Sequence, residues 1–412
     1  MKQRILHAIS IICILLLLAI SSNAQNGASS AYTTFGVGRI ESASTIKYQG
    51  MGGVGVALPT YYSINTLNPA SLGSVEGEQM LIDLGIRSSF TTYEHNTESG
   101  NGLSGGLNNI SLAFRSGKRL VTSFNIVQYS SIGYNVASSD YIEGTSTQIA
   151  KNYEGNGGLN KVAMSNALVL GKNLSLGLEL SYIFGKLIKQ ENYASSIIGG
   201  ELNVQYSDFL QQVCLQAGFQ YKIPVGQSNL FVGAVYSPEI DFKTSREVET
   251  SSSSGAGIYE DLDREPYNIP MGYGAGLGWI DEHGIKIGFD YKFQNWAGVD
   301  YTNNLSEYKD SHRFSGGVEY QSRKSRRVNP FTWRLGGYYE DSYLEVKGKS
   351  LLDRGITAGI GVPMRSPHSY LNISINYGQR GTASNSLITE NYYGMSVSMS
   401  ILEAWFRKRK FD

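Results

Sequence analysis

Apolar and polar residues alternate along most of this chain, from about Gln79 to the C-terminal end. In the segment 173–184, leucine and aromatic side chains occupy every second position, and serine, glycine and glutamate occupy most positions between them. The same alternation recurs over 284–294, 370–379 and 393–401. Because successive side chains of a β-strand point to opposite faces, this period of two predicts strands with one apolar face.

Fourteen segments of this kind can be placed, and short turns alternate with longer polar loops between them. The short turns include 117–118 and 171–172, and the longer loops include 137–158 and 246–266. This alternation of connection lengths is typical of an up-and-down antiparallel barrel in the outer membrane. The predicted strands span 79–95, 105–116, 119–136, 159–170, 173–190, 201–223, 228–245, 267–281, 284–296, 311–322, 331–346, 353–363, 369–380 and 391–402.

A soluble all-β protein also shows alternation, so two other architectures need to be weighed. A propeller would repeat a motif about every 40–45 residues, and the sequence has no such motif. A sandwich of this length would need several domains joined by linkers, and no linker is evident. The sequence therefore predicts an all-β transmembrane barrel of about 14 strands over residues 79–412.

The first 24 residues have the pattern of a secretory signal peptide. Lys2 and Arg4 precede an apolar run over 11–20, and Ser22-Asn23-Ala24 places small residues at the cleavage position. The apolar run is about half as long as a membrane-spanning helix requires. We expect cleavage near Ala24, export through the periplasm, and insertion into the cell outer membrane as a multi-pass protein.

Composition gives little support for catalysis or for nucleic-acid binding. Lys plus Arg and Asp plus Glu both number 35, so the formal net charge is zero and no basic field is present. No Gly-x-Ser-x-Gly elbow occurs, and no histidines have metal-ligand spacing on one strand face. With Cys13 in the predicted signal peptide, Cys214 has no internal disulfide partner. The sequence predicts no catalytic residue, no cofactor and no metal site, and hence a protein that is not an enzyme.

Residues 25–78 do not alternate and are rich in glycine. They contain Phe-Gly-Val-Gly at 35–38, Met-Gly-Gly-Val-Gly-Val-Ala-Leu at 51–58 and Asn-Pro-Ala-Ser-Leu at 68–72. Glycine clusters permit close backbone approach, and the Asn-Pro step favours a turn that leads into a short helix. Fourteen strands enclose a hole wider than their side chains fill. We therefore expect residues 25–78 to form an N-terminal plug inside the barrel lumen, and glycines at every second position of 272–278 to leave a bare strand face beside it or a bend.

These three motifs resemble the hatch of FadL-type outer-membrane transporters, most closely the branch found in Bacteroidetes. The resemblance continues near 270–296, 379–393 and 405–410 and covers essentially the whole mature chain. It implies a fourteen-strand barrel with a hatch, and uptake of hydrophobic molecules such as long-chain fatty acids. Asn68, Pro69 and Ala70 match the hatch motif.

The same resemblance implies a lateral exit. The family has one at a kink in the third strand. In this chain that region contains Ser130, Ser131 and Gly133.

Several charged residues fall on the polar face of the predicted strands and are expected to point into the lumen. They can bind the carboxylate head group of a ligand, or pair with each other and with the plug; the pattern leaves both readings open. These residues are Arg115, Glu179, Lys286, Asp290, Lys292, Arg334 and Glu340.

Together these features favour an outer-membrane channel for passive uptake of hydrophobic small molecules such as long-chain fatty acids. Its expected partners are outer-membrane lipid and a fatty-acid-like or detergent-like hydrophobic ligand. The alternative is a non-transporting FadL-like accessory or scaffold subunit of an outer-membrane protein assembly or secretion complex. In that case the partners would be other outer-membrane proteins.

Overall fold

The computed structural model describes most of the chain between residues 30 and 404. The predicted signal peptide and the C-terminal segment 405–412 lie outside the described residues, so these predictions stay untested. The described ranges are 30–42, 44–75, 77, 79–141, 148–195, 200–252, 255–263, 267–299, 306–322, 330–364, 368–381 and 387–404.

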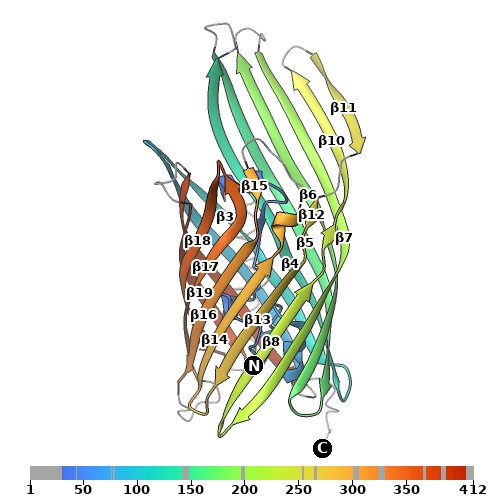
Figure 1. The fold of residues 1–412 in the computed structure, drawn as a ribbon, viewed down its shortest axis with the longest axis vertical. Helices are drawn as coiled ribbons and strands as arrows, with labels where there is room; N and C mark the ends of the chain where they lie inside the picture. Colours follow the sequence, from blue (N-terminus) through green and yellow to red (C-terminus); the bar gives the residue numbers. More distant parts are fainter. Residues whose placement is uncertain are drawn as a thin grey trace, which may run out of the picture.

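The wall is a closed antiparallel barrel of fourteen strands, which confirms the predicted fold class (Figure 1). Each wall strand pairs with the next along the chain, and the last, β20, pairs with the first, β2. Three wall strands are interrupted, so that β8 continues as β10, β11 as β13, and β15 as β16. The strands are β2 (Gln79–His95), β3 (Glu98–Arg115), β4 (Leu120–Tyr141), β5 (Gln148–Leu170), β6 (Leu174–Ser195), β7 (Gly200–Val225), β8 (Ser228–Ser237), β10 (Lys243–Ser252), β11 (Gly255–Asp263), β13 (Gly272–Ile280), β14 (Ile285–Gln294), β15 (Ser306–Tyr308), β16 (Ser311–Gln321), β17 (Thr332–Val346), β18 (Lys349–Pro363), β19 (Tyr370–Arg380) and β20 (Thr389–Ala404).

The exterior of the wall is covered with large apolar side chains. Leu178, Leu335 and Ile356 are 54%, 65% and 64% exposed, whereas the alternating neighbours Glu179 and Arg334 are almost fully buried inside the barrel. A protein in water would not present a continuous apolar exterior around a polar interior. This inside-out arrangement suits a barrel wall that meets lipid.

Several segments predicted as loops are strands in the structure. The β4–β5 pairing extends to Tyr141 opposite Gln148, inside the predicted loop 137–158, and β10 and β11 form a hairpin within the predicted loop 246–266. These extensions have polar residues on both faces, so they carry no period-two signal. The expected boundaries were therefore wrong here, although the strand count was right.

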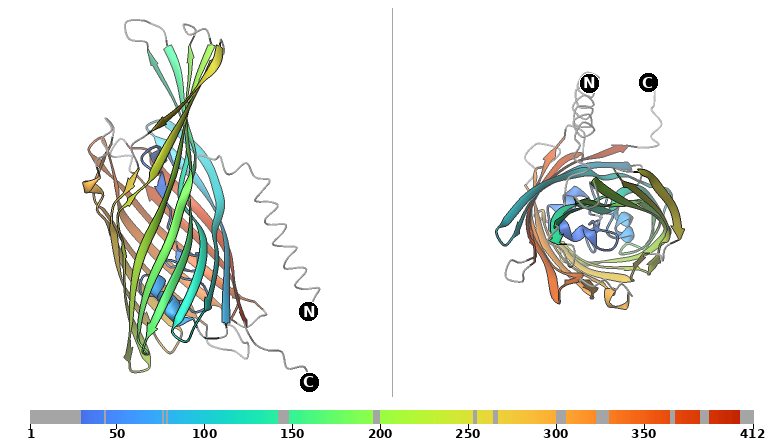
Figure 2. Two further views of the ribbon diagram at one scale, coloured as in Figure 1. Left: turned by 90° about the vertical axis from the view of Figure 1, so that its right-hand side faces the viewer. Right: turned by 90° about the horizontal axis from the view of Figure 1, so that it is seen from above.

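The segment before the wall lies inside the barrel, as the view from above in Figure 2 shows. It contains the 3-10 helix η2 (Ala31–Thr34), the two-residue strand β1 (Arg39–Ile40), the short helix α2 (Ile46–Gln49) and the 3-10 helix η3 (Pro69–Ser74). We call its described residues, 30–77, the plug. Its side chains Ile46, Val54 and Val56 are completely buried.

Wall glycines bring the plug into direct contact with the barrel. On seven neighbouring wall strands, β6 to β17, one glycine has no room for a Cβ atom, which would lie under 3.0 Å from another atom. For most of these glycines that atom belongs to the plug; Gly276 lies beside Ala57 there, on the bare strand face expected over 272–278. We call this set the glycine belt: Gly177, Gly218, Gly233, Gly276, Gly288, Gly317 and Gly336.

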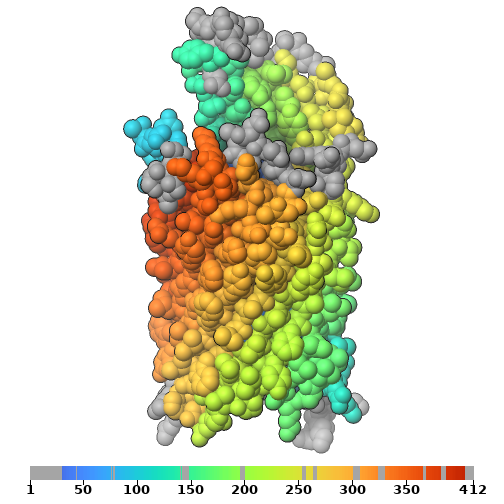
Figure 3. Space-filling model, in the orientation of Figure 1, coloured from blue at the N-terminus to red at the C-terminus, as the bar shows by residue number. Residues whose placement is uncertain are grey.

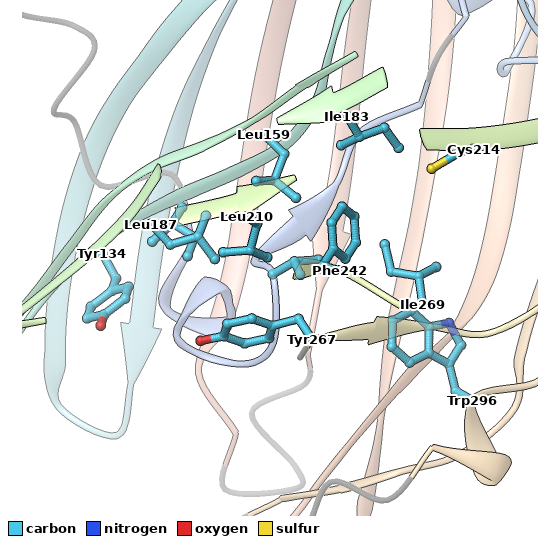
Figure 4. Packing of buried hydrophobic residues seen from close by; sticks show 12 residues of the cluster. Tyr134, Leu159, Ile183, Leu187, Leu210, Cys214, Phe242, Tyr267, Ile269 and Trp296 are labelled. Atoms are coloured by element: carbon cyan, nitrogen blue, oxygen red, sulfur yellow. The ribbon is translucent and has the colours of Figure 1, made fainter. Parts of the chain in front are cut away.

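A buried apolar cluster lies inside the barrel and includes the plug residue Val37 (Figure 4). Its side chains come from strands β4 to β7, from the strand pair β9 (Ile240–Asp241) and β12 (Asn268–Ile269), and from the 3-10 helix η4 (Trp296–Gly298). The plug residue Ile40 packs against it. The plug therefore contacts wall glycines on one side and an apolar layer on the other.

The glycine belt generates a stability prediction. Gly317→Ala places a methyl group against the Met51 backbone of the plug, whereas Gly316→Ala, one residue earlier, meets no atom nearer than 4.0 Å. We expect Gly317→Ala to lower the free energy of unfolding by about 1–3 kcal/mol and Gly316→Ala to change it by less than about 0.5 kcal/mol. Heat or urea unfolding in detergent micelles, followed by gel mobility, measures both. Equal effects of the two variants would contradict direct plug–wall packing.

Candidate functional site

A cavity of about 510 Å³ lies between the plug and the wall. Plug residues from Gly38 to Gly53 line one part of it, and residues of wall strands all around the barrel line the rest. We call this cavity the chamber.

The wall next to the chamber is not fully paired. Strands β3 and β4 pair only over 109–115 and 121–127. Strand β3 nevertheless remains paired with β2 as far as Glu98, and β4 remains paired with β5 as far as Tyr141. The β3 residues before Asn109 and the β4 residues after Val127 are therefore not paired with each other. We call this gap the wall split.

The chamber reaches both edges of the wall split. Ser104 and Gly105 of β3 line it on one edge, and Gln128 and Tyr129 of β4 line it on the other. A β-bulge interrupts β4 between Gln128 and Ser130. The residues predicted for a lateral exit, Ser130, Ser131 and Gly133, thus lie on the β4 edge of this split.

The plug covers the β4 edge that β3 leaves unpaired. Arg39 and Ile40 of β1 pair with Ser131 and Ser130. On either side of that pairing, the Ser30 amide donates to the Gly133 carbonyl at 3.0 Å, and the Glu41 amide donates to the Tyr129 carbonyl at 2.9 Å. The plug therefore supplies a short strand where the wall lacks one.

The carboxylate of Glu41 links the two sides of the wall split. It accepts a hydrogen bond from the Ser131 hydroxyl of β4 at 2.6 Å and pairs with the Arg87 guanidinium of β2 at 2.9 Å. The Arg39 guanidinium lies 2.8 Å from the same carboxylate, and Arg87 also donates to the Gln128 amide oxygen at 3.0 Å. Charge-assisted bonds of this kind are about twice as strong as neutral ones. We call this set of contacts the Glu41 bridge.

The surroundings of Glu41 keep its carboxylate ionised. Burial alone would raise the pKa of Glu41, but the charges of Arg39 and Arg87 and the Ser131 hydrogen bond outweigh burial and lower this pKa to about 2. The side chain is only 7% exposed, so solvent screens these interactions weakly.

Most other charged side chains of the chamber are also paired. Lys161 contacts Glu179 at 2.8 Å, Arg313 contacts Glu340 at 2.5 Å, and Arg380 contacts Asp353 at 2.6 Å. Lys292 also lines the chamber, and within the described part of the chain no hydrogen bond or ion pair is found for its ammonium group. The charges of Asp290 and Glu340 also act on Lys292, so this lysine lines the chamber near carboxylates but without a hydrogen bond to one.

The other lumen charges expected from the sequence contact the wall or the plug. Glu179 holds Lys161, and Lys286 and Arg334 both pair with Glu319, at 2.5 and 2.6 Å. One carboxylate oxygen of Asp290 accepts the amide hydrogens of Gly55 and Val56 at 2.7 and 2.9 Å. Arg115 donates to the Val75 carbonyl at 2.7 Å. Of the two readings left open, these contacts suit pairing within the protein.

The three hatch-motif residues join the plug to the wall. Pro69 is the first residue of η3, and the Asn68 side chain caps this helix by accepting the Ala70 amide hydrogen at 2.9 Å. The Asn68 amide group also donates to the Val56 carbonyl at 2.6 Å and to the Phe219 carbonyl of β7 at 3.0 Å. Asparagine supplies both a donor and an acceptor, which explains why this position needs it.

Sequence reasoning missed Glu41 and Arg87. For Arg87 a signal existed, because it follows Asp83 and Gly85 at every second position on the inward face of β2. Glu41 lies in the plug, which has no periodicity, and its two partners in the wall are 46 and 90 residues away along the chain. No local pattern identifies such a residue.

Within the ranges that the structure describes, no group of three or more His, Cys, Asp or Glu side chains has an arrangement that could hold a metal ion. No helix among these residues has the length and apolar character needed to cross a membrane.

Comparison with known proteins supports the fold. The family model described as BamG matches residues 2–412. The solved structure titled "CymD monoaromatic hydrocarbon channel" is 16% identical, covering 86% of this chain and 96% of that one, with a TM-score of 0.59. The Pseudomonas putida toluene transporter TodX is 16% identical, covering 87% and 97%, with a TM-score of 0.60. The Ralstonia pickettii toluene transporter TbuX is 14% identical, covering 86% and 96%, with a TM-score of 0.57.

No curated protein matches the sequence. At these low identities the solved structures show the fold alone, and they confirm the barrel that the sequence predicts.

The ionisation of Glu41 gives a pH prediction. Its pKa is about 2 in the folded protein against an ordinary value of 4.5, so its contribution to stability is complete above pH 4.5 and is lost as the pH falls toward 2. The shift corresponds to on the order of 3 kcal/mol. We expect the wild type to lose more stability than Glu41→Gln between pH 4.5 and 2, and the difference between the two proteins to stay constant from pH 5 to 8. Unfolding in acid-stable detergent measures both proteins, and parallel curves below pH 4.5 would contradict the Glu41 bridge.

Proposed function

This chain belongs to the BamG family, and we propose that it forms an outer-membrane channel for passive uptake of hydrophobic small molecules. The observation that carries the proposal is a chamber inside a lipid-facing barrel that reaches both edges of a split in the wall. The solved proteins that share the fold are titled as hydrocarbon channels and toluene transporters. This architecture suits transport better than a non-transporting scaffold role, which requires neither a chamber nor a wall split.

The chamber lining favours an amphiphile such as a long-chain fatty acid. Ile132, Tyr343 and Leu344 supply apolar surface where the chamber meets the apolar cluster. Lys292 supplies a cation whose charge is not neutralised by a neighbouring carboxylate in hydrogen-bond contact. Pairing with an anionic ligand would stabilise the half-buried Lys292 ammonium group. The alkyl chain would lie against the apolar side and the carboxylate against Lys292.

The plug contact at β4 controls the proposed exit. A ligand would enter past the apolar cluster, occupy the chamber, and leave through the wall split into the outer leaflet. Release of β1 breaks its two-residue pairing with β4, the flanking backbone bonds of Ser30 and Glu41, and the contacts of the Glu41 bridge. The plug remainder would stay in place, held by the glycine belt.

A reversible crosslink tests this exit. Ile40 and Ser130 lie directly opposite each other in the β1–β4 pairing. The neighbouring pair, Glu41 and Tyr129, is hydrogen-bonded, so Ile40 and Ser130 form a non-hydrogen-bonded pair. The Cα atoms of such a pair lie close enough for a disulfide. In a Cys214→Ser background, we expect Ile40→Cys with Ser130→Cys to reduce fatty-acid uptake to the level of a deletion strain when oxidised. Reduction with a thiol reagent should restore uptake. Uptake of radiolabelled fatty acid into whole cells is the measurement.

The single-cysteine variants are the matched controls and should transport under both conditions. If the oxidised double variant transports normally, the exit does not lie between β1 and β4. If deletion of the protein leaves the uptake of fatty acids and of aromatic hydrocarbons unchanged, the transport proposal itself is wrong.

The role of Lys292 can be tested by comparing a charged ligand with an uncharged one. We expect Lys292→Gln to weaken fatty-acid binding by about 10-fold or more, the value of a charge-assisted hydrogen bond, and to leave toluene binding unchanged. Lys292→Arg should keep most of the affinity, and Lys172→Gln, in an exposed turn, should have no effect. Binding to the purified protein in detergent-free nanodiscs is measured for both ligands. Equal losses for the charged and the uncharged ligand would show that Lys292 has only a structural role.

A further inference from the structure

Six strands continue far beyond the rest of the barrel, on the side opposite the short turns (Figures 1 and 3). They are the outer parts of β4, β5, β6 and β7, followed by β10 and β11. On β7 the outward positions change from Val213 and Leu215 near the membrane to Asn203 and Gln205 farther out. Lipid does not accept such a polar exterior, so this extension stands in water at the cell surface.

The extension ends in an edge strand. In the described part of the chain β11 pairs only with β10, so one side of its nine residues presents unpaired backbone groups. Natural proteins usually protect such edges with lysine, proline, a bulge or a covering segment. The β11 sequence, Gly-Ala-Gly-Ile-Tyr-Glu-Asp-Leu-Asp, contains neither lysine nor proline. Its pairing with β10 has a bulge only at the start of the strand, before Ile258, and is regular from there to Asp263. Ile258 and Tyr259 are 63% and 62% exposed, and Leu262 is 43% exposed.

The charges around this edge determine what it can accept. Glu247 of β10 lies directly opposite Asp261 of β11, and Glu249 and Glu260 lie on the same two strands. The nearby cation Arg246 is already paired with Asp208 at 2.5 Å. Like charges in facing positions repel, so pairing with a second copy of β11 is unfavourable. An incoming strand with lysine or arginine would neutralise these carboxylates.

We propose that β11 is a docking edge for an extended, basic segment of a partner protein at the cell surface, which adds as a further strand next to β11. Backbone hydrogen bonds along the edge supply part of the affinity, and the carboxylates select for basic side chains. The proposal is independent of transport through the chamber, because β11 lies outside it.

Two synthetic peptides test the docking edge on the full-length protein in nanodiscs. Both are about ten residues long, the usual length of a strand; one alternates threonine with lysine and the other threonine with glutamate. We expect the lysine peptide to bind at least about tenfold more tightly, since opposite-charge and like-charge pairs differ by this order. Fluorescence anisotropy measures affinity, and hydrogen exchange should show new protection of the β11 amides when the lysine peptide binds.

Charge reversal supplies the discriminating variant. Glu260→Lys with Asp261→Lys changes only exposed side chains of β11 and should reverse the preference, so that the glutamate peptide binds better. The matched control, Glu282→Lys with Glu403→Lys, adds the same charge at the short-turn end and should keep the original preference. The proposal is overturned if neither peptide binds, if the preference does not follow the β10–β11 charges, or if bound peptide leaves the β11 amides unprotected.

Discussion

The close contact between the plug backbone and the wall glycines is the constraint on which the rest of this structure depends. Three belt residues, Gly288, Gly317 and Gly336, face each other in register on β14, β16 and β17 and form a bare strip. Side chains there would hold the plug away from the wall. Because the strip fixes where Met51 and Val54 lie, it also fixes how far β1 and Glu41 extend along the lumen. The chamber is the space that remains beyond this contact.

Hydrogen bonds of buried polar groups also fix the position of the plug in the barrel. Asp290 binds two plug amides, and Asp83 accepts hydrogen bonds from the hydroxyl of Ser63 in the plug and the hydroxyl of Ser400 in the wall. Leaving such carboxylates without their donors is costly, so displacement of the whole plug is strongly disfavoured. The two-residue pairing of β1 is a much smaller unit.

The sequence predicted the parts of the fold that have a periodic or local cause. Alternation over 173–184 and 284–294 corresponds to β6 and β14 because one face of these strands meets an apolar environment and the other a polar one. The extension formed by β10 and β11 was missed because water surrounds both of its faces. Asn68, Pro69 and Ala70 were found through local turn chemistry. Glu41 was not found, because its role arises only when β2, β4 and the plug meet in space.

The wall split changes what the plug must do for the membrane. An unpaired strand edge inside the hydrocarbon layer carries exposed amide and carbonyl groups, which lipid does not satisfy. On the β4 edge these groups are satisfied by β1, Ser30 and Glu41. The β3 edge over 98–108 is rich in glycine, serine and asparagine, and its Ser104 and Gly105 line the chamber. The plug therefore closes the barrel twice, across the lumen through the glycine belt and along the wall through β1. In the proposed exit, the β1 pairing, its flanking backbone bonds and the Glu41 bridge are the contacts that have to break, while the glycine belt keeps the lumen blocked.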